Sequence, residues 1–198
     1  MVKYYKKVTI ENDFAQPILT SNGTLGGDSF AVYAYDLVDG AAYRAFDGIV
    51  QTNQSSCCTT NGKGYIEFYN PTPIKLVSIQ TYDYVTNTSY RCEEGIIYGS
   101  NDGTNWAVLT TFTQPTSTGT GNLLPVINVN SNDAYKYFKI KNEKSGTGGT
   151  SGEWVVPEII ITATEQTQGW QECTKAQYDQ LPDDQKRIEN VNYIVNVA

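Results

Sequence analysis

The stretch Gly95-Ile-Ile-Tyr-Gly-Ser-Asn-Asp-Gly-Thr-Asn-Trp-Ala-Val-Leu109 decides the fold class. Two β-rich runs, 96–98 and 107–109, flank a segment of Gly, Ser, Asn, Asp and Thr. Because these residue types tolerate positive φ or form turns, the stretch predicts a hairpin. A hairpin is not stable alone in water, so other strands must cover it. Trp106, beside the turn, is expected to bury its ring and fix the register.

The rest of the chain repeats this pattern of short β runs separated by turn-forming segments. Strands are expected at 3–10 (an edge strand), 30–35, 65–69, 74–82, 123–129, 134–141 and 154–163, with the hairpin's second arm reaching Phe112. Residues 70–73 (NPTP) are expected to break a strand, and Pro157 to mark an edge or a bulge. Residues 51–64 are expected to form a polar loop. Residues 41–48 are expected to form one helical turn that packs Phe46 inward. About eight short strands with almost no helix predict an all-β fold, a two-sheet β-sandwich.

The character of the sequence changes after Ala163. Residues 166–169 are expected to be a linker, and Thr174 with Gln177 forms a capping-box pattern that predicts a short helix ending at Pro182. The alternation in 190–197 predicts a strand. We therefore divide the chain into a β-sandwich, residues 1–165, and a C-terminal helix–strand appendage for assembly or anchoring, residues 166–198. The appendage is too small to fold alone.

Composition excludes several classes of function. The 198 residues carry a net charge of −7 and include no His, which argues against His-ligated zinc and serine-triad catalysis. The acidic balance argues against a nucleic-acid partner. No apolar run approaches the roughly 20 residues of a membrane span, so no membrane insertion is expected. The N-terminus lacks an apolar signal core, so we expect synthesis in the cytoplasm without secretion by that route.

The four cysteines, Cys57, Cys58, Cys92 and Cys173, fit no CxxC zinc pattern. We expect small buried thiols. A disulfide from Cys57 or Cys58 to Cys92 is the alternative.

Three stretches together resemble the discoidin family, also called coagulation factor V/VIII C-type or galactose-binding-like domains. They are 42–48 (AYRAFDG), 97–106 (IYGSNDGTNW), and 134–140 (AYKYFKI) with Pro157-Glu158-Ile159. The resemblance covers about residues 10–163. It implies a jelly-roll β-sandwich that binds glycans, lipids or proteins and seldom catalyses. The sequence departs from the family where a Trp usually follows the Asp-Gly loop, because Cys57 and Cys58 lie there instead.

The same resemblance implies a structural calcium ion. By match, its ligands are Asp47, loop carbonyls or hydroxyls with Thr52 as a candidate, and Glu158. Calcium suits such a set because it takes six to eight oxygen ligands, some of which loop carbonyls supply. The alternative is that Asp47 caps a turn and Glu158 is a solvated strand residue.

The C-terminal segment, 174–182 through 190–195, resembles a short ending found on bacteriophage fibre and other virion proteins. Together the two resemblances imply a virion structural protein, a head or tail fibre or decoration subunit. It would display a carbohydrate-binding module for adhesion to the host surface. The implied partners are other virion proteins, further copies of the chain and a cell-surface glycan. The alternative is a carbohydrate-binding module of a polysaccharide-processing system.

Sugar binding needs aromatic faces and a few fixed polar groups. The loop candidates are Trp154, Arg91, Tyr84 and Tyr90, and the alternative for each is packing. No catalytic site is evident, so we do not expect an enzyme. A glycosidase needs two carboxylates across a cleft, whereas Glu93 and Glu94 on one strand would point to opposite faces.

Overall fold

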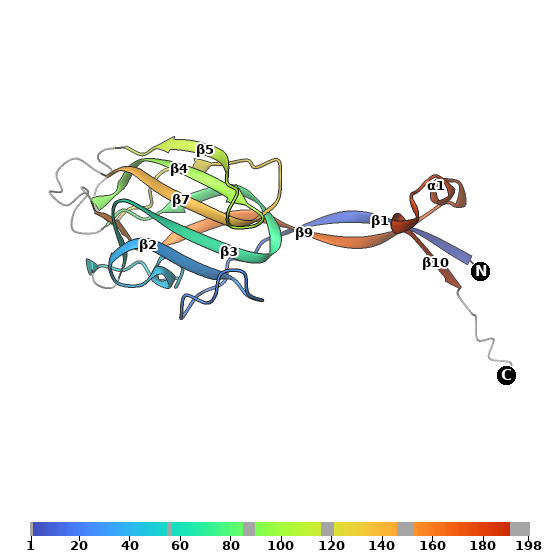
Figure 1. Cartoon of the computed structure of the whole chain (residues 1–198), viewed down its shortest axis with the longest axis horizontal. Helices are drawn as coiled ribbons and strands as arrows, with labels where there is room; N and C mark the ends of the chain where they lie inside the picture. Colours follow the sequence, from blue (N-terminus) through green and yellow to red (C-terminus); the bar gives the residue numbers. More distant parts are fainter. Residues whose placement is uncertain (1, 55–56, 85–89, 116–120, 146–152, 191–198) are drawn as a thin grey trace. The chain divides into compact units, whose positions relative to one another are not determined.

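The computed structural model describes residues 2–54, 57–84, 90–115, 121–145 and 153–190. Within these residues the strands are β1 Val2–Asp13, β2 Ala31–Asp39, β3 Cys58–Thr81, β4 Cys92–Ser100, β5 Ala107–Thr113, β6 Ile127–Asn128, β7 Tyr135–Ser145, β8 Trp154–Val156, β9 Ile159–Cys173 and β10 Lys186–Asn190 (Figure 1). The helices are the 3-10 turns η1 Ala42–Ala45 and η4 Asp183–Gln185, and α1 Lys175–Asp179. The all-β class is confirmed. No helix in the described ranges is long and apolar enough to span a membrane.

The chain divides into two compact units. The larger unit is Asp13–Glu165, and the smaller combines Met1–Asn12 with Gln166–Ala198. The sequence-based division assigned residues 1–12 to the sandwich, whereas the structure groups them with the C-terminal segment. The first twelve residues group with the C-terminal segment because β1 lies between β10 and β9. For the same reason β1 is not the edge strand that the sequence predicts.

β3 organises the larger unit. Its residues 65–69 pair with β2 on one side and β7 on the other, whereas residues 74–81 pair with β9, all antiparallel. The predicted break at 70–73 is instead a shift of register inside one long strand. Pro71 and Pro73 have no N–H to donate to a ladder, so the strand changes partners there and connects the two layers of the sandwich.

The predicted hairpin is confirmed as β4 and β5, with Tyr98 opposite Val108 and Gly99 opposite Ala107. The prediction for Trp106 is wrong, because its ring is only half-buried. Side chains alternate between the faces of a strand. This parity places Trp106 on the outer face with Val108, which is 61% exposed.

The core lies between the two layers and is rich in aromatic rings. Phe68 and Phe138 stack with centroids 4.9 Å apart, and Phe30 contacts Phe46 and Phe68. Phe46, which follows η1, is fully buried as predicted. The core also takes in residues of the predicted polar loop 51–64. Cys58 to Thr60 are buried because they pair with β8.

Other sequence predictions need correction. The predicted strand 123–129 is reduced to β6 and a bridge at Leu123. The predicted linker 166–169 is part of β9. All four cysteines are free, so the disulfide alternative is wrong. Burial raises the pKa values of Cys57 and Cys58 to about 12, which keeps both thiols protonated and unreactive near neutral pH.

In the smaller unit, β1 pairs with β10 from Val2 opposite Asn190 to Lys6 opposite Lys186. The predicted capping box is confirmed, since the backbone N–H of Gln177 donates to Thr174 Oγ1 and Gln177 Oε1 accepts from the backbone N–H of Thr174. The helix ends at Asp179, earlier than predicted. The predicted strand 190–197 lies outside the described residues beyond Asn190.

Candidate functional site

Two of the three predicted calcium ligands come together where the turn after η1 meets the start of β9. Asp47 Oδ1 accepts a hydrogen bond from the backbone N–H of Ile49 at 2.9 Å, and Glu158 Oε2 accepts from that of Gly48 at 3.2 Å. Gly48 has a φ of +74°, a left-handed conformation that glycine adopts without strain. Burial and the nearby charge of Asp47 raise the pKa of Glu158 to about 8, although the backbone N–H groups oppose this.

This pair fits a hard cation in part. A cation would offset the repulsion between the two carboxylates, and loop oxygens would have to supply the other ligands. Thr52 is exposed. The described residues contain no group of three or more His, Cys, Asp or Glu placed to hold a metal ion. Asp47 does cap a turn, as the alternative states, but Glu158 is only 6% exposed and is not a solvated strand residue.

The four predicted glycan-binding side chains are buried or partly buried. Trp154 is 3% exposed and packs in the core, where its ring has no free face to stack on a sugar. Tyr84 packs with Cys57 and Val155, and the partly buried Tyr90 packs against this cluster. The prediction assigned these residues to loops. Trp154 is instead the first residue of β8, whose three residues are all buried.

Arg91 is also turned inward. Its guanidinium donates to Asp83 Oδ2 at 2.7 Å and to the carbonyl oxygen of Pro115 at 2.5 Å, and the side chains of Arg91 and Asp83 are 1% and 0% exposed. The pair ties the start of β4 to two neighbouring segments. In this position Arg91 stabilises the fold and cannot reach a ligand in solvent.

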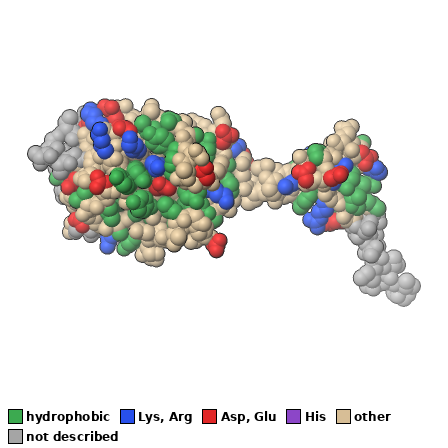
Figure 2. All heavy atoms as spheres, in the orientation of Figure 1, with side chains coloured by type: hydrophobic (Ala, Val, Ile, Leu, Met, Phe, Trp, Pro, Cys, Tyr) green, Lys and Arg blue, Asp and Glu red, His purple; other side chains and the backbone are tan. Residues whose placement is uncertain are grey.

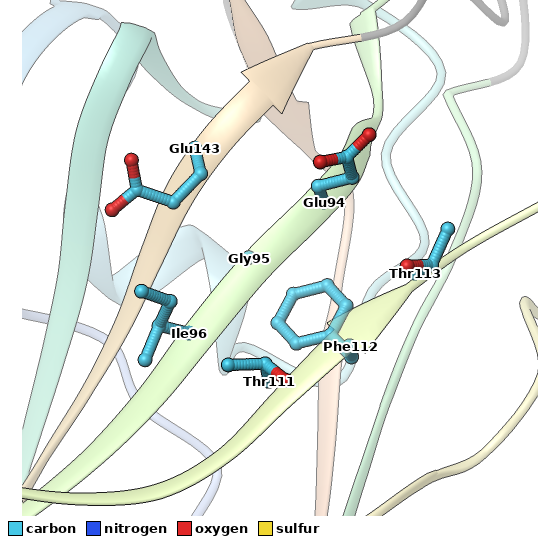
Figure 3. A pocket seen from close by; sticks show the side chains of 7 residues that line it. All are labelled: Glu94, Gly95, Ile96, Thr111, Phe112, Thr113 and Glu143. Carbon is cyan, nitrogen blue, oxygen red and sulfur yellow. The ribbon is translucent and has the colours of Figure 1, made fainter.

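A cavity of about 350 Å³ lies over β4 and β5, lined by Glu94, Gly95, Ile96, Thr111, Phe112, Thr113 and Glu143 (Figure 3). Gly95 is needed here because an added Cβ would lie 2.4 Å from the Phe112 ring. The carboxylates of Glu94 and Glu143 turn away from each other (Figure 3) and pair with Lys144 and Lys141 at 3.2 and 2.5 Å. They do not converge on one point, as a catalytic carboxylate pair would. As predicted, Glu93 and Glu94 point to opposite faces, one buried and one exposed.

The outer face of the β2–β3–β7–β4 layer carries a cluster of aromatic residues that we call the aromatic face. It consists of Tyr33, Tyr35, Tyr65, Tyr98 and Trp106, with Lys139 and Lys141 among them. Strand pairing creates it, because Tyr35 lies opposite Tyr65, Tyr65 opposite Lys141, and Lys139 opposite Tyr98. Figure 2 shows hydrophobic side chains interspersed with charged ones over these strands.

An open, mainly apolar pocket of about 260 Å³ lies on the aromatic face, lined by Tyr65, Tyr98, Trp106, Lys139 and Lys141. The Lys139 ammonium lies 3.7 Å from the centroid of the Trp106 ring and 4.6 Å from that of Tyr65. The ammonium therefore makes cation–π contacts with both rings. Burial lowers the pKa of Lys139, and Glu67, 3.8 Å away, opposes this.

Sequence reasoning did not identify this face as a site. It assigned glycan binding to loop residues and expected Trp106 to bury its ring. The available signal was the parity of Tyr33 and Tyr35 on one strand and of Tyr98 on another. This parity shows that the residues share one face only when the order of the strands is known.

No protein-family model matches the sequence, and no curated protein matches it. Solved structures do. A family 32 carbohydrate-binding module from a family 31 glycoside hydrolase of Clostridium perfringens is 16% identical, with 68% of this chain and 88% of that chain covered and a TM-score of 0.54. An F5/8 type C domain of a Bacteroides fragilis protein is 14% identical, covering 70% and 93%, with a TM-score of 0.53. The chain has a discoidin-like fold.

A third match is the family 32 module of C. perfringens NanJ, solved in complex with galactose. It is 16% identical, covers 80% of this chain and all of its own, and has a TM-score of 0.51. The predicted jelly-roll β-sandwich of the discoidin, galactose-binding-like type is therefore confirmed as a fold. The structural neighbours are carbohydrate-binding modules and lectins.

Proposed function

We propose that the larger unit is a carbohydrate-binding module and that its ligand occupies the pocket of the aromatic face. The observation that carries the proposal is the set of three aromatic rings, Tyr65, Tyr98 and Trp106, around one open pocket with two lysine side chains. Ring faces stack on the apolar face of a pyranose, while ammonium and phenol groups donate hydrogen bonds to its hydroxyls. The sugar complexes of similarly folded modules support the proposal.

The pocket is proposed in place of the predicted loop residues. Trp154, Tyr84 and Arg91 are each less than a tenth exposed. A sugar could reach their rings or guanidinium only after local unfolding. The proposed activity is binding alone, without catalysis.

Glycan-array binding followed by titration calorimetry tests the proposal. We expect Trp106→Ala to weaken binding of the best array glycan about five- to thirtyfold, because stacking contributes on the order of 1–2 kcal/mol. Val126→Ala is the control, since Val126 is 47% exposed in the larger unit but does not line the pocket. Equal affinities for wild type and Trp106→Ala would contradict the assignment.

We further propose that the protein is a virion structural protein, a fibre or decoration subunit made in the host cytoplasm, with the smaller unit used for assembly. Among residues 2–12 and 166–189 no side chain is buried. Val2, Ile10, Trp170 and Ile188 are 41–51% exposed. A small sheet without buried side chains needs a covering partner. Further copies of the chain and other virion proteins are the proposed partners.

Charge supports self-association through this unit. It holds six Lys or Arg (Lys3, Lys6, Lys7, Lys175, Lys186, Arg187) and six Asp or Glu (Glu11, Glu172, Asp179, Asp183, Asp184, Glu189), so its net charge is zero. The whole net charge of −7 therefore lies on the larger unit. Copies can approach through the neutral unit while the acidic units repel one another.

Light scattering on the full chain tests assembly. We expect an oligomer, and we expect Ile188→Glu to dissociate it. The control Val108→Glu, on the 61%-exposed Val108 of the larger unit, should leave the mass unchanged. A monomeric wild type that also fails to co-purify with phage particles would favour the second candidate, a carbohydrate-binding module of a polysaccharide-processing system.

We also propose that Asp47 and Glu158 hold a structural calcium ion. The support is their shared position and the raised pKa of the buried Glu158 carboxyl. A bound cation would favour the charged form of both groups.

A further inference from the structure

We propose that the aromatic face binds an extended, neutral polysaccharide chain laid across the strands, with Tyr33 and Tyr35 forming a second subsite beside the pocket. This inference rests on the proposed carbohydrate function and specifies the class of ligand. It differs from recognition of a single terminal sugar, for which the pocket alone would suffice.

The first argument is the length of the face. Tyr35 of β2 lies opposite Tyr65 of β3, which in turn lies opposite Lys141 of β7. Two residues along β7, Lys139 lies opposite Tyr98 of β4. From β2 to β4 there are three inter-strand spacings of about 4.8 Å, roughly 14 Å in all. That distance exceeds one sugar ring.

The second argument is the continuity of ring surface. The Tyr35 and Tyr65 rings stack with centroids 5.0 Å apart and planes 6° apart, and Tyr33 lies 6.3 Å from Tyr65. Tyr65 also lines the pocket. The aromatic surface therefore runs from the pocket to β2 without a break. Tyr33 and Tyr35 remain 44% and 51% exposed, so the parts of their rings that do not pack on Tyr65 are accessible to a ligand.

The third argument concerns charge. Each lysine of the face already has an acidic partner: Lys139 lies 3.8 Å from Glu67, and Lys141 lies 2.5 Å from Glu143. The face therefore offers no excess positive charge to an anionic sugar. The net charge of −7 on this unit would repel a polyanion further. Both features select a neutral chain.

The fourth argument concerns β2 itself, which in the described residues pairs with β3 alone. Directly after Tyr35 the register shifts, and Asp36 adopts a φ of +59°. A bulge with a charged residue on an outer strand disfavours pairing with another strand. The face is thus suited to a ligand that contacts side-chain rings rather than to a β-strand of a second protein.

Titration calorimetry on the full chain tests the inference. The probes are cello-, laminari-, manno- and malto-oligosaccharides from dimer to hexamer, with heparin as the anionic probe. In at least one neutral series we expect affinity to rise about tenfold or more from dimer to hexamer. We expect Tyr33→Ala/Tyr35→Ala to lower hexamer affinity about tenfold and to leave dimer affinity unchanged, whereas Trp106→Ala weakens both. Val126→Ala is the control, because Val126 is 47% exposed in the larger unit and does not line the pocket. Thermal unfolding confirms that each variant is folded.

The outcomes separate this inference from the proposed function. If Trp106→Ala weakens binding but the tyrosine variant matches wild type on every length, the extended chain is wrong and the carbohydrate function stands. Tighter binding of heparin than of any neutral series would refute the neutral ligand. If light scattering shows that the tyrosine variant changes the oligomeric mass, the face is a protein interface. Absence of binding to every neutral series would overturn the extended chain, and absence of binding to every glycan of the array would overturn the carbohydrate function as well.

Discussion

The buried ion pair of Arg91 and Asp83 gives a sharp prediction for stability. The two charged atoms lie 2.7 Å apart, and the side chains are 1% and 0% exposed. Asp83→Ala would remove the carboxylate to which the buried guanidinium donates. Removing one member of a buried ion pair costs about 3–5 kcal/mol. We therefore expect the free energy of unfolding, measured by urea denaturation of the full chain, to fall by that amount.

Two further variants test the reasoning behind this number. Glu94→Gln breaks a pair with Lys144 whose side chains are 52% and 49% exposed, and it should cost less than about 1 kcal/mol. Asp83→Leu/Arg91→Met removes both charges and should recover most of the loss. The reasoning is refuted if Asp83→Ala costs no more than Glu94→Gln. Loss of glycan binding by folded Arg91 variants would restore Arg91 as a ligand-binding residue.

Three other predictions follow from contacts described above. Because the pKa of Glu158 is about 8 in the folded chain against an ordinary 4.5, the native state keeps a proton that the unfolded state has lost. The free energy of unfolding should therefore fall by up to about 1.4 kcal/mol per pH unit between pH 4.5 and 8, and urea denaturation should show a flatter profile for Glu158→Gln. Calcium should raise the Tm of the wild type near pH 8 but not that of Asp47→Asn/Glu158→Gln, and equal shifts would exclude this site. Gly95→Ala should lower stability by about 1–3 kcal/mol in thermal melts, because the new Cβ would meet the Phe112 ring and the Lys141 carbonyl oxygen, and an unchanged Tm would show that β4 can move.

Local sequence patterns correctly predicted the strands in which apolar and polar residues alternate. The hairpin of β4 and β5 and the strand over 134–141 follow from sequence spacing alone. The segment from Cys58 to Thr60 reads as polar loop, yet it is buried because it pairs with β8, almost a hundred residues later. Such burial has no local signal, since Thr and Cys suit either setting.

The position of the candidate site likewise has no local signal in the sequence. Parity separates Ile97 from Tyr98 but does not say which of the two faces the core when both are apolar. In the structure Ile97 is fully buried, and Tyr98 lines the pocket on the outer face. Once that choice is made, every second residue of the layer follows, and Tyr35, Tyr65 and Trp106 must share the outer face. The aromatic face is therefore a consequence of strand order and parity together. Moving any one strand by a single residue would bury its aromatic residue and remove it from the face.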